Sequence, residues 1–189
     1  MRLTINNLNR AIDEKLSSYE LSLYIYITKR ADIKGLMTDL HMQEAIDALG
    51  CSKQTFYNSL YALHENGFVH VNFFKNSKGY DVIVNNNSFK SYADKSKPYL
   101  NLYYTLIESH EFIQLPVQLK RFILRAFTFI KHKKWTISSD VLKKYGVTIE
   151  DIEKFFEITT SGTNSYGDTI YHLKIKDLYR STDTNVAYS

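Results

Sequence analysis

The stretch LGCSKQTFYNSLYALHENGFVHV, residues 49–71, constrains the fold more than any other part of the chain. Gly50 is a helix stop, and Ser52 can cap a new helix over residues 53–66, whose apolar side chains recur at spacings of four and three. After Gly67 the apolar period changes to two, which is typical of a strand. The stretch therefore predicts two helices joined by a tight turn and followed by a strand.

The neighbouring residues extend this pattern to three helices and a β-hairpin. Ser17 and Glu20 have the spacing of a capping box, which marks the start of the first helix. Beyond Gly67, two alternating apolar segments flank a short polar turn. The expected elements are helices at 18–30, 41–49 and 53–66, strands at 68–74 and 80–84, and a turn at 75–79.

Two helices around a short Gly-containing turn predict a helix-turn-helix, whose second helix fits the DNA major groove. The motif's pattern is carried by Ala45, Leu49, Gly50, Ser52, Thr55, Leu60, Leu63 and Gly67. On these residues, 18–84 resemble a winged helix-turn-helix domain of the bacterial regulator type. The resemblance implies that the hairpin is a wing that meets the DNA backbone or minor groove beside the recognition helix.

The candidate DNA contacts are the side chains expected to face away from the core of this domain. Gln and Asn can pair with adenine, whereas hydroxyl groups and the amides at a helix start suit phosphates. The recognition-helix candidates are Ser52, Lys53, Gln54, Thr55, Tyr57, Asn58 and Tyr61. The wing-tip candidates are Lys75, Asn76, Ser77 and Lys78.

A polar stretch ending at Pro98 divides the chain into an N-terminal domain at 1–85, a linker at 86–98 and a C-terminal domain at 99–189. The second half has the same order of elements as the first, so a second winged helix is expected. The fold class is therefore α+β, mainly α, with two winged helices in tandem. The expected elements of the second half are helices at 98–110, 117–133, 139–145 and 149–156 and a strand at 169–175.

The helix expected at 149–156 takes the place of the recognition helix in the second half, and it is mainly acidic. Its carboxylates at Glu150, Asp151, Glu153 and Glu157 would repel phosphates. Two uses remain open for this half: it binds a protein partner or a second copy of the chain, or it turns its basic long helix toward DNA. That helix could also be an ordinary solvated face. Its basic residues are Lys120, Arg121, Arg125, Lys131, Lys133 and Lys134.

Other classes of function find little support. The single cysteine, Cys51, excludes an internal disulfide and a cysteine-rich zinc site, and we expect it to pack under the helix pair rather than to act as a sensor. The six histidines lack metal-ligand spacing, and phosphate loops and nucleophile elbows are missing from the sequence. We expect no enzyme activity, metal or cofactor, and no secretory signal or membrane span.

The sequence thus predicts a cytoplasmic, sequence-specific double-stranded DNA-binding protein. A homodimeric transcriptional regulator is the first expectation, because one recognition helix covers only a half-site. A plasmid or phage replication-initiation or partition protein is the alternative within DNA binding. A protein-interaction adaptor with a winged-helix fold is the alternative outside it. The net charge of +4 permits DNA binding without requiring it.

Overall fold

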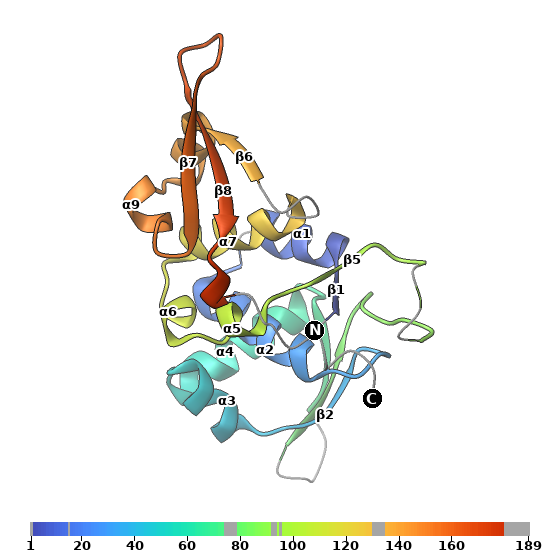
Figure 1. Cartoon of the computed structure of the whole chain (residues 1–189). Helices are drawn as coiled ribbons and strands as arrows, with labels where there is room; N and C mark the ends of the chain where they lie inside the picture. Colours follow the sequence, from blue (N-terminus) through green and yellow to red (C-terminus); the bar gives the residue numbers. More distant parts are fainter. Residues whose placement is uncertain are drawn as a thin grey trace. The chain divides into compact units, whose positions relative to one another are not determined.

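The computed structural model describes residues 2–14, 16–73, 79–91, 94, 96–129 and 135–179. The chain divides into two compact units, Met1–Leu102 and Tyr103–Ser189. Each unit combines helices with a small three-stranded antiparallel sheet (Figure 1), which confirms the α+β class.

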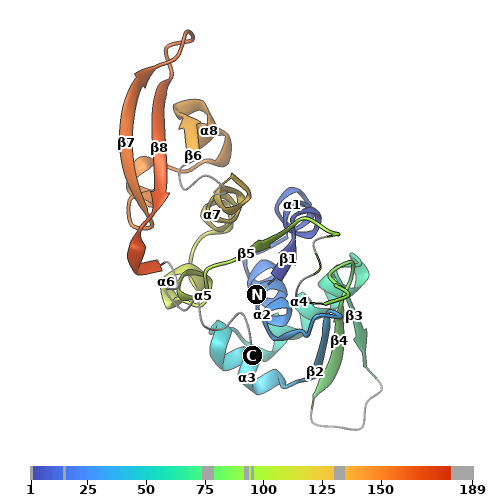
Figure 2. The same cartoon turned by 45° about the vertical axis from the view of Figure 1, so that its right-hand side comes forward.

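The first unit is built around one three-stranded sheet of order β2-β4-β3. Helices α2 and α4 contact this sheet and each other, and Figure 2 shows them on the same side of it. A separate two-stranded sheet pairs β1 with β5. The elements are β1 (Arg2–Thr4), α1 (Ile5–Asp13), α2 (Ser18–Arg30), β2 (Leu36–Leu40), α3 (Met42–Leu49), α4 (Lys53–Glu65), β3 (Val69–Asn72), β4 (Tyr80–Val84) and β5 (Tyr99–Asn101).

Helix α2 forms the centre of the first unit. Its predicted capping box is confirmed: the Ser17 amide donates to the Glu20 carboxylate at 2.7 Å, and the Glu20 amide donates to the Ser17 hydroxyl at 3.3 Å. Every residue from Leu21 to Thr28 is buried. A helix that is covered on all sides lies in the core rather than at the surface, and α3 and α4 both pack against α2.

The tight turn between α3 and α4 follows the prediction. Gly50 ends α3 in the left-handed region at φ 60° and ψ 39°, where a residue without Cβ is not strained. Ser52 then caps α4, its hydroxyl accepting from the Thr55 amide at 3.1 Å. Two residues thus stop one helix and start the next, which fixes the direction in which α4 leaves the turn.

Strand β2 was missed by the sequence analysis. It pairs antiparallel with β4 through a bulge between Met37 and Leu40, and Asp39 within the bulge has a φ of 53°. The bulge breaks the alternation by which a strand is recognised in a sequence. A Cβ at Gly79 would lie 2.9 Å from the Asp39 backbone, so glycine is needed where the hairpin crosses β2.

The described part of the segment expected as a linker packs on the first unit. Asn87 is buried, accepts from the Thr4 amide at 2.9 Å and donates to the Arg2 carbonyl at 3.0 Å. The Phe89 ring is also buried. The helix expected at 98–110 is wrong, because β5 takes its first residues into a pairing with β1 and two short helices follow.

The second unit has a sheet of order β6-β8-β7. Its long β7–β8 hairpin extends beyond the helices of the unit (Figure 1). The elements are α5 (Tyr104–Ile107), α6 (His110–Ile113), α7 (Val117–Phe129), β6 (Trp135–Ser138), α8 (Ser139–Tyr145), α9 (Ile149–Ile152), β7 (Phe156–Thr163), β8 (Thr169–Ile175) and η2 (Asp177–Tyr179).

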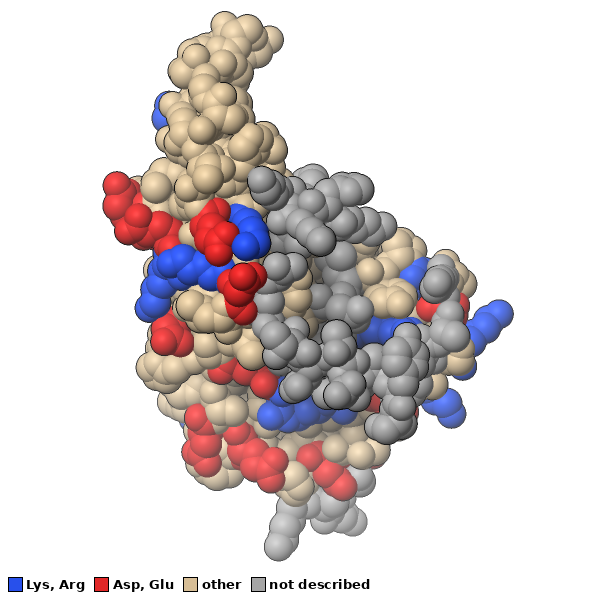
Figure 3. Space-filling view, viewed as in Figure 1, with Lys and Arg blue, Asp and Glu red and all other residues tan. Residues whose placement is uncertain are grey.

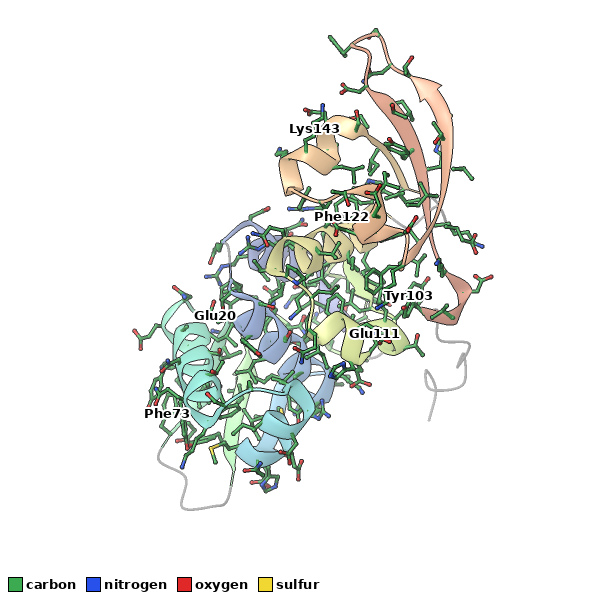
Figure 4. The ribbon with its side chains drawn as sticks, turned by 90° about the vertical axis from the view of Figure 1, so that its left-hand side faces the viewer. Glu20, Phe73, Tyr103, Glu111, Phe122 and Lys143 are labelled. Atoms are coloured by element: carbon green, nitrogen blue, oxygen red, sulfur yellow. The ribbon has the colours of Figure 1, made fainter. Side chains whose placement is uncertain are left out.

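The core of the second unit gathers around Phe122 on α7. Its ring centroid lies 5.1 Å from that of Trp135, 5.5 Å from that of Tyr145 and 6.2 Å from that of Phe156. Figure 4 shows Phe122 reaching from α7 toward the strands. This cluster joins the long helix, α8 and both outer strands of the sheet into one core.

Both units place their elements in the same order: a long helix, a strand, two helices and a hairpin, with the second hairpin strand in the middle of the sheet. The two units differ in the helix that precedes the hairpin, since α4 has 13 residues and α9 has 4. The helix expected at 149–156 is therefore too long. Phe156 begins strand β7 instead, and the Phe155 carbonyl accepts from the Lys176 amide at 3.0 Å next to the sheet.

Candidate nucleic-acid interface

Helix α4 has one buried and one exposed face. Its buried face consists of Phe56, Ser59, Leu60 and Leu63, and each large apolar side chain there contributes about 2 kcal/mol of burial. Of the residues predicted to contact DNA, Ser52, Lys53, Gln54, Asn58 and Tyr61 are exposed, and Thr55 and Tyr57 are half-buried. The packing of α4 thus leaves all seven recognition-helix candidates outside the core.

The polar residues of the first turns bond to each other. The Ser52 and Thr55 hydroxyl oxygens lie 2.9 Å apart, next to the cap that begins the helix. One turn on, Gln54 Nε2 donates to Asn58 Oδ1 at 2.7 Å. These bonds hold polar groups in defined positions on the exposed face instead of leaving them to rotate freely.

Aromatic rings join α4 to the base of the β3–β4 hairpin. The Tyr61 ring stacks on Phe73 with centroids 4.8 Å apart and an angle of 14° between the planes. Phe73 lies beside α4 in Figure 4 and also meets Tyr80 at 5.9 Å. His64 Nδ1 accepts from the Val71 amide at 3.3 Å. The helix and the hairpin base therefore form one continuous surface.

Two tyrosine hydroxyl groups form a hydrogen bond next to these rings. The Tyr80 hydroxyl donates to the Tyr57 hydroxyl at 3.3 Å. Because that bond needs the Tyr80 proton, it raises the pKa of Tyr80 to about 12, with burial adding to the effect. Tyr80 consequently stays uncharged at neutral pH and places no negative charge beside the exposed face of α4.

Arg10 on α1 supports the far end of α4 and was missed by the sequence analysis. Its guanidinium donates to the Gly67 carbonyl at 3.1 Å and to the Asn66 carbonyl, and it lies 4.3 Å from the centroid of the Phe68 ring. A cation at a helix C-terminus satisfies free carbonyl groups and favours the helix dipole. The sequence carried no signal for this contact, since its partners are 56 and 57 residues away.

The charge around α4 is mixed. Lys53 is the one Lys or Arg in α4, while Glu44 and Asp47 on α3 and Glu65 at the end of α4 are exposed. On the face drawn in Figure 3, acidic side chains gather over α3. The wing-tip candidates Lys75, Asn76, Ser77 and Lys78 lie outside the described residues.

The basic candidates of the second unit divide into three groups. Lys120 is 0 % exposed and donates to the Ile113 carbonyl at 2.7 Å, so its expected DNA contact is wrong. Burial lowers the pKa of Lys120 to about 8. Arg121 and Arg125 are half-buried, and Arg125 Nε donates to the Tyr145 hydroxyl at 3.2 Å. Lys131, Lys133 and Lys134 fall outside the residues that the structure describes.

Helix α9 differs from α4 in charge as well as in length. Glu150, Asp151, Glu153 and Glu157 are all exposed. The Asp151 carboxylate accepts from the Thr148 amide at 2.8 Å in a capping box. The pKa of Glu150 is lowered by hydrogen bonds from the Glu150 backbone amide and from the Thr148 side chain, so the Glu150 carboxylate stays charged. Helix α9 therefore presents a single acidic turn, whose carboxylates would repel phosphates, where α4 presents 13 residues with one lysine and one glutamate.

The described residues contain neither a cluster of metal ligands nor a helix suited to a membrane. In that part of the chain, His, Cys, Asp and Glu side chains form no group of three or more suited to a metal ion. Nor does any described helix have the length and apolar character needed to cross a membrane. The chain matches no family profile, no curated protein and no solved structure with which it was compared.

Proposed function

We propose that this protein binds double-stranded DNA in a sequence-specific manner and acts as a transcriptional regulator. In this proposal the first unit is a winged helix-turn-helix, α4 enters the major groove and the β3–β4 hairpin lies against the backbone or minor groove. The element order and the β2-β4-β3 sheet of this unit support the assignment. The size of α4 suits the groove, since 13 residues form a helix of about 20 Å.

One observation carries the proposal: α4 exposes a row of uncharged hydrogen-bonding side chains. Gln54, Asn58 and Tyr61 follow one another at spacings of four and three along the exposed side of the helix. The Gln54–Asn58 bond and the stacking of Tyr61 on Phe73 hold these side chains in place on that side of the helix. Fixed donors and acceptors are the groups that base edges require.

The test is duplex binding by the full chain at increasing salt concentration. If phosphates contribute, log affinity falls linearly with log salt, because bound cations release counterions from DNA. Asn58→Ala is expected to reduce the difference between duplexes, whereas Lys53→Ala is expected to weaken all duplexes alike. An affinity that does not change with salt would exclude DNA binding.

A second candidate function concerns the second unit, where we propose a contact with a second copy of the chain or with another protein. The acidic exposed residues around α9 favour this use over a second DNA contact. A homodimer would bring two α4 helices to two half-sites one helical turn apart. Footprinting distinguishes the proposals: two adjoining sites per chain would favour a replication-initiation or partition protein, and one per chain a dimeric regulator.

A further inference from the structure

The exposed row on α4 contains a bonded amide pair that can select a base. Gln54 and Asn58 are both exposed and lie one helical turn apart. Gln54 Nε2 donates to Asn58 Oδ1 at 2.7 Å, which uses one Gln54 hydrogen and the Asn58 carbonyl oxygen. The bond leaves the Gln54 carbonyl oxygen as an acceptor and the Asn58 Nδ2 group as a donor, together with the second hydrogen of Gln54 Nε2.

Adenine offers the complementary groups in the major groove. Its N6 amino group donates and its N7 accepts, so one edge meets both amides at once. Guanine presents two acceptors at O6 and N7 and has no major-groove donor for the Gln54 oxygen. Cytosine and thymine each offer a single hydrogen-bonding group there.

The side chains that usually read guanine, arginine and lysine, are scarce on α4. Arginine is absent from α3 and α4, and the one lysine of α4 is Lys53, which stands at the first helical position. Tyr61, which is 50 % exposed, continues the row and presents a ring fixed on Phe73. An apolar ring at this place suits the methyl group of thymine.

We infer that the Gln54–Asn58 pair reads the adenine of an A·T base pair, with Gln54 accepting from N6 and Asn58 donating to N7. The inference rests on the proposed function, because it requires α4 to lie in the major groove. On this inference the protein prefers DNA sites that contain A·T base pairs, and Gln54 and Asn58 set that preference.

The experiment compares full-chain binding to two duplexes of about 20 base pairs, enough for two half-sites, one of alternating A·T and one of alternating G·C pairs. A third duplex carries 7-deazaadenine, which removes the N7 acceptor but keeps the base pair. We expect the A·T duplex to bind roughly tenfold more tightly than the G·C duplex, and the 7-deazaadenine duplex to lose much of that advantage.

Two variants assign the effect to the pair. Asn58→Ala is expected to remove the sensitivity to 7-deazaadenine, and Gln54→Ala is expected to reduce the A·T preference while retaining that sensitivity. Gln43→Ala is the matched control, because Gln43 Nε2 makes the same kind of bond, to Asp47 at 2.8 Å, on the exposed side of α3. It should leave all three affinities unchanged.

The possible failures are distinguishable. Salt-dependent binding without A·T preference, or with a preference that 7-deazaadenine does not reduce, would overturn the adenine assignment and leave the proposed function standing. In the latter case groove shape rather than base contact would set the preference. Binding to none of the duplexes, or binding that does not change with salt, would overturn both.

Discussion

The α4 and α9 regions occupy the same place in the two units yet expose different chemistry. Each follows a helix that ends in a left-handed glycine, Gly50 or Gly146, and each starts at a hydroxyl cap, Ser52 or Thr148. The first continues for 13 residues with amides and tyrosines outside, and the second ends after 4 among carboxylates. The order of elements thus fixes where each helix stands, and the exposed side chains of the helix decide what it can bind.

The largest expected effect concerns the core beside α9. Phe122→Ala should lower the free energy of unfolding of the second unit by about 3–5 kcal/mol, because it empties the centre of the aromatic cluster. Urea unfolding followed by the fluorescence of Trp135, the sole tryptophan, measures this. Tyr166→Ala is the control, since Tyr166 is 90 % exposed and should change stability by less than about 0.5 kcal/mol.

If DNA binding survives Phe122→Ala at a temperature where the second unit has unfolded, the two regions are separable in function. A loss of binding in step with the Trp135 transition would show that DNA binding needs the second unit, either as the proposed contact between two copies or as a second DNA contact. In that case α4 would not be sufficient for DNA binding by itself.

The next effect concerns Lys120, the buried lysine of the second unit. Its pKa of about 8 in the folded chain lies below the ordinary value of 10.5, so the folded state holds fewer protons than the unfolded state between these values. Stability should therefore rise with pH across that window, by about 3 kcal/mol in total. The Lys120→Met variant should not show this increase in stability with pH. Urea unfolding at each pH gives the free energy of unfolding of both proteins, and the difference between them separates the effect of Lys120 from that of tyrosine titration.

A smaller effect is expected at the end of α4. Arg10→Ala should cost the first unit about 1–2 kcal/mol, since two carbonyl groups lose a charged donor and the helix loses a cation at its C-terminus. Faster hydrogen exchange of the amides near Asn66 would locate the loss. Glu14→Ala removes only the exposed ion pair with Arg10 and should cost less than about 0.5 kcal/mol; an equal cost for both variants would show that the ion pair, not the cap, matters.

The smallest effect compares matched lysines beside the two helices. Lys53→Ala should reduce the slope of log affinity against log salt by about 1, the value for one lost phosphate contact. Lys154→Ala, which removes an exposed lysine that follows α9, should leave the slope unchanged. Equal changes in duplex titrations would place both regions at DNA and favour the tandem arrangement of a replication-initiation or partition protein.

Much of the fold could be predicted because its signals are local. The Ser17–Glu20 capping box, the Gly50 stop and the Ser52 cap each act within a few residues, and all three hold. Strand β2 escaped prediction because its bulge destroys alternation. The end of α9 escaped because Phe155 and Phe156 fit an apolar helix stripe as well as a strand, and only the pairing of Phe156 with Ile175 distinguishes the two.

The candidate site divides in the same way. Periodicity was sufficient to assign Gln54, Asn58 and Tyr61 to the outside of α4, because the buried stripe leaves one remaining face. The contacts between Tyr61 and Phe73 and between Arg10 and Gly67 could not be derived from it, since they join elements distant in the chain. The basic residues of α7 suggested an exposed charged face, but Lys120 does not belong to it. Its long side chain turns the amine inward to the Ile113 carbonyl.

The sequence by itself determined where helices start and stop around Gly50 and which residues of α4 stay out of the core. These features depend on backbone preferences and on the spacing of apolar residues, which are properties of a short stretch. Only the tertiary structure decided that β2 joins the sheet, that Lys120 is internal and that aromatic rings fasten α4 to the hairpin. Those outcomes depend on contacts between residues that are distant in the chain, and a local sequence pattern does not contain the free energy of such contacts.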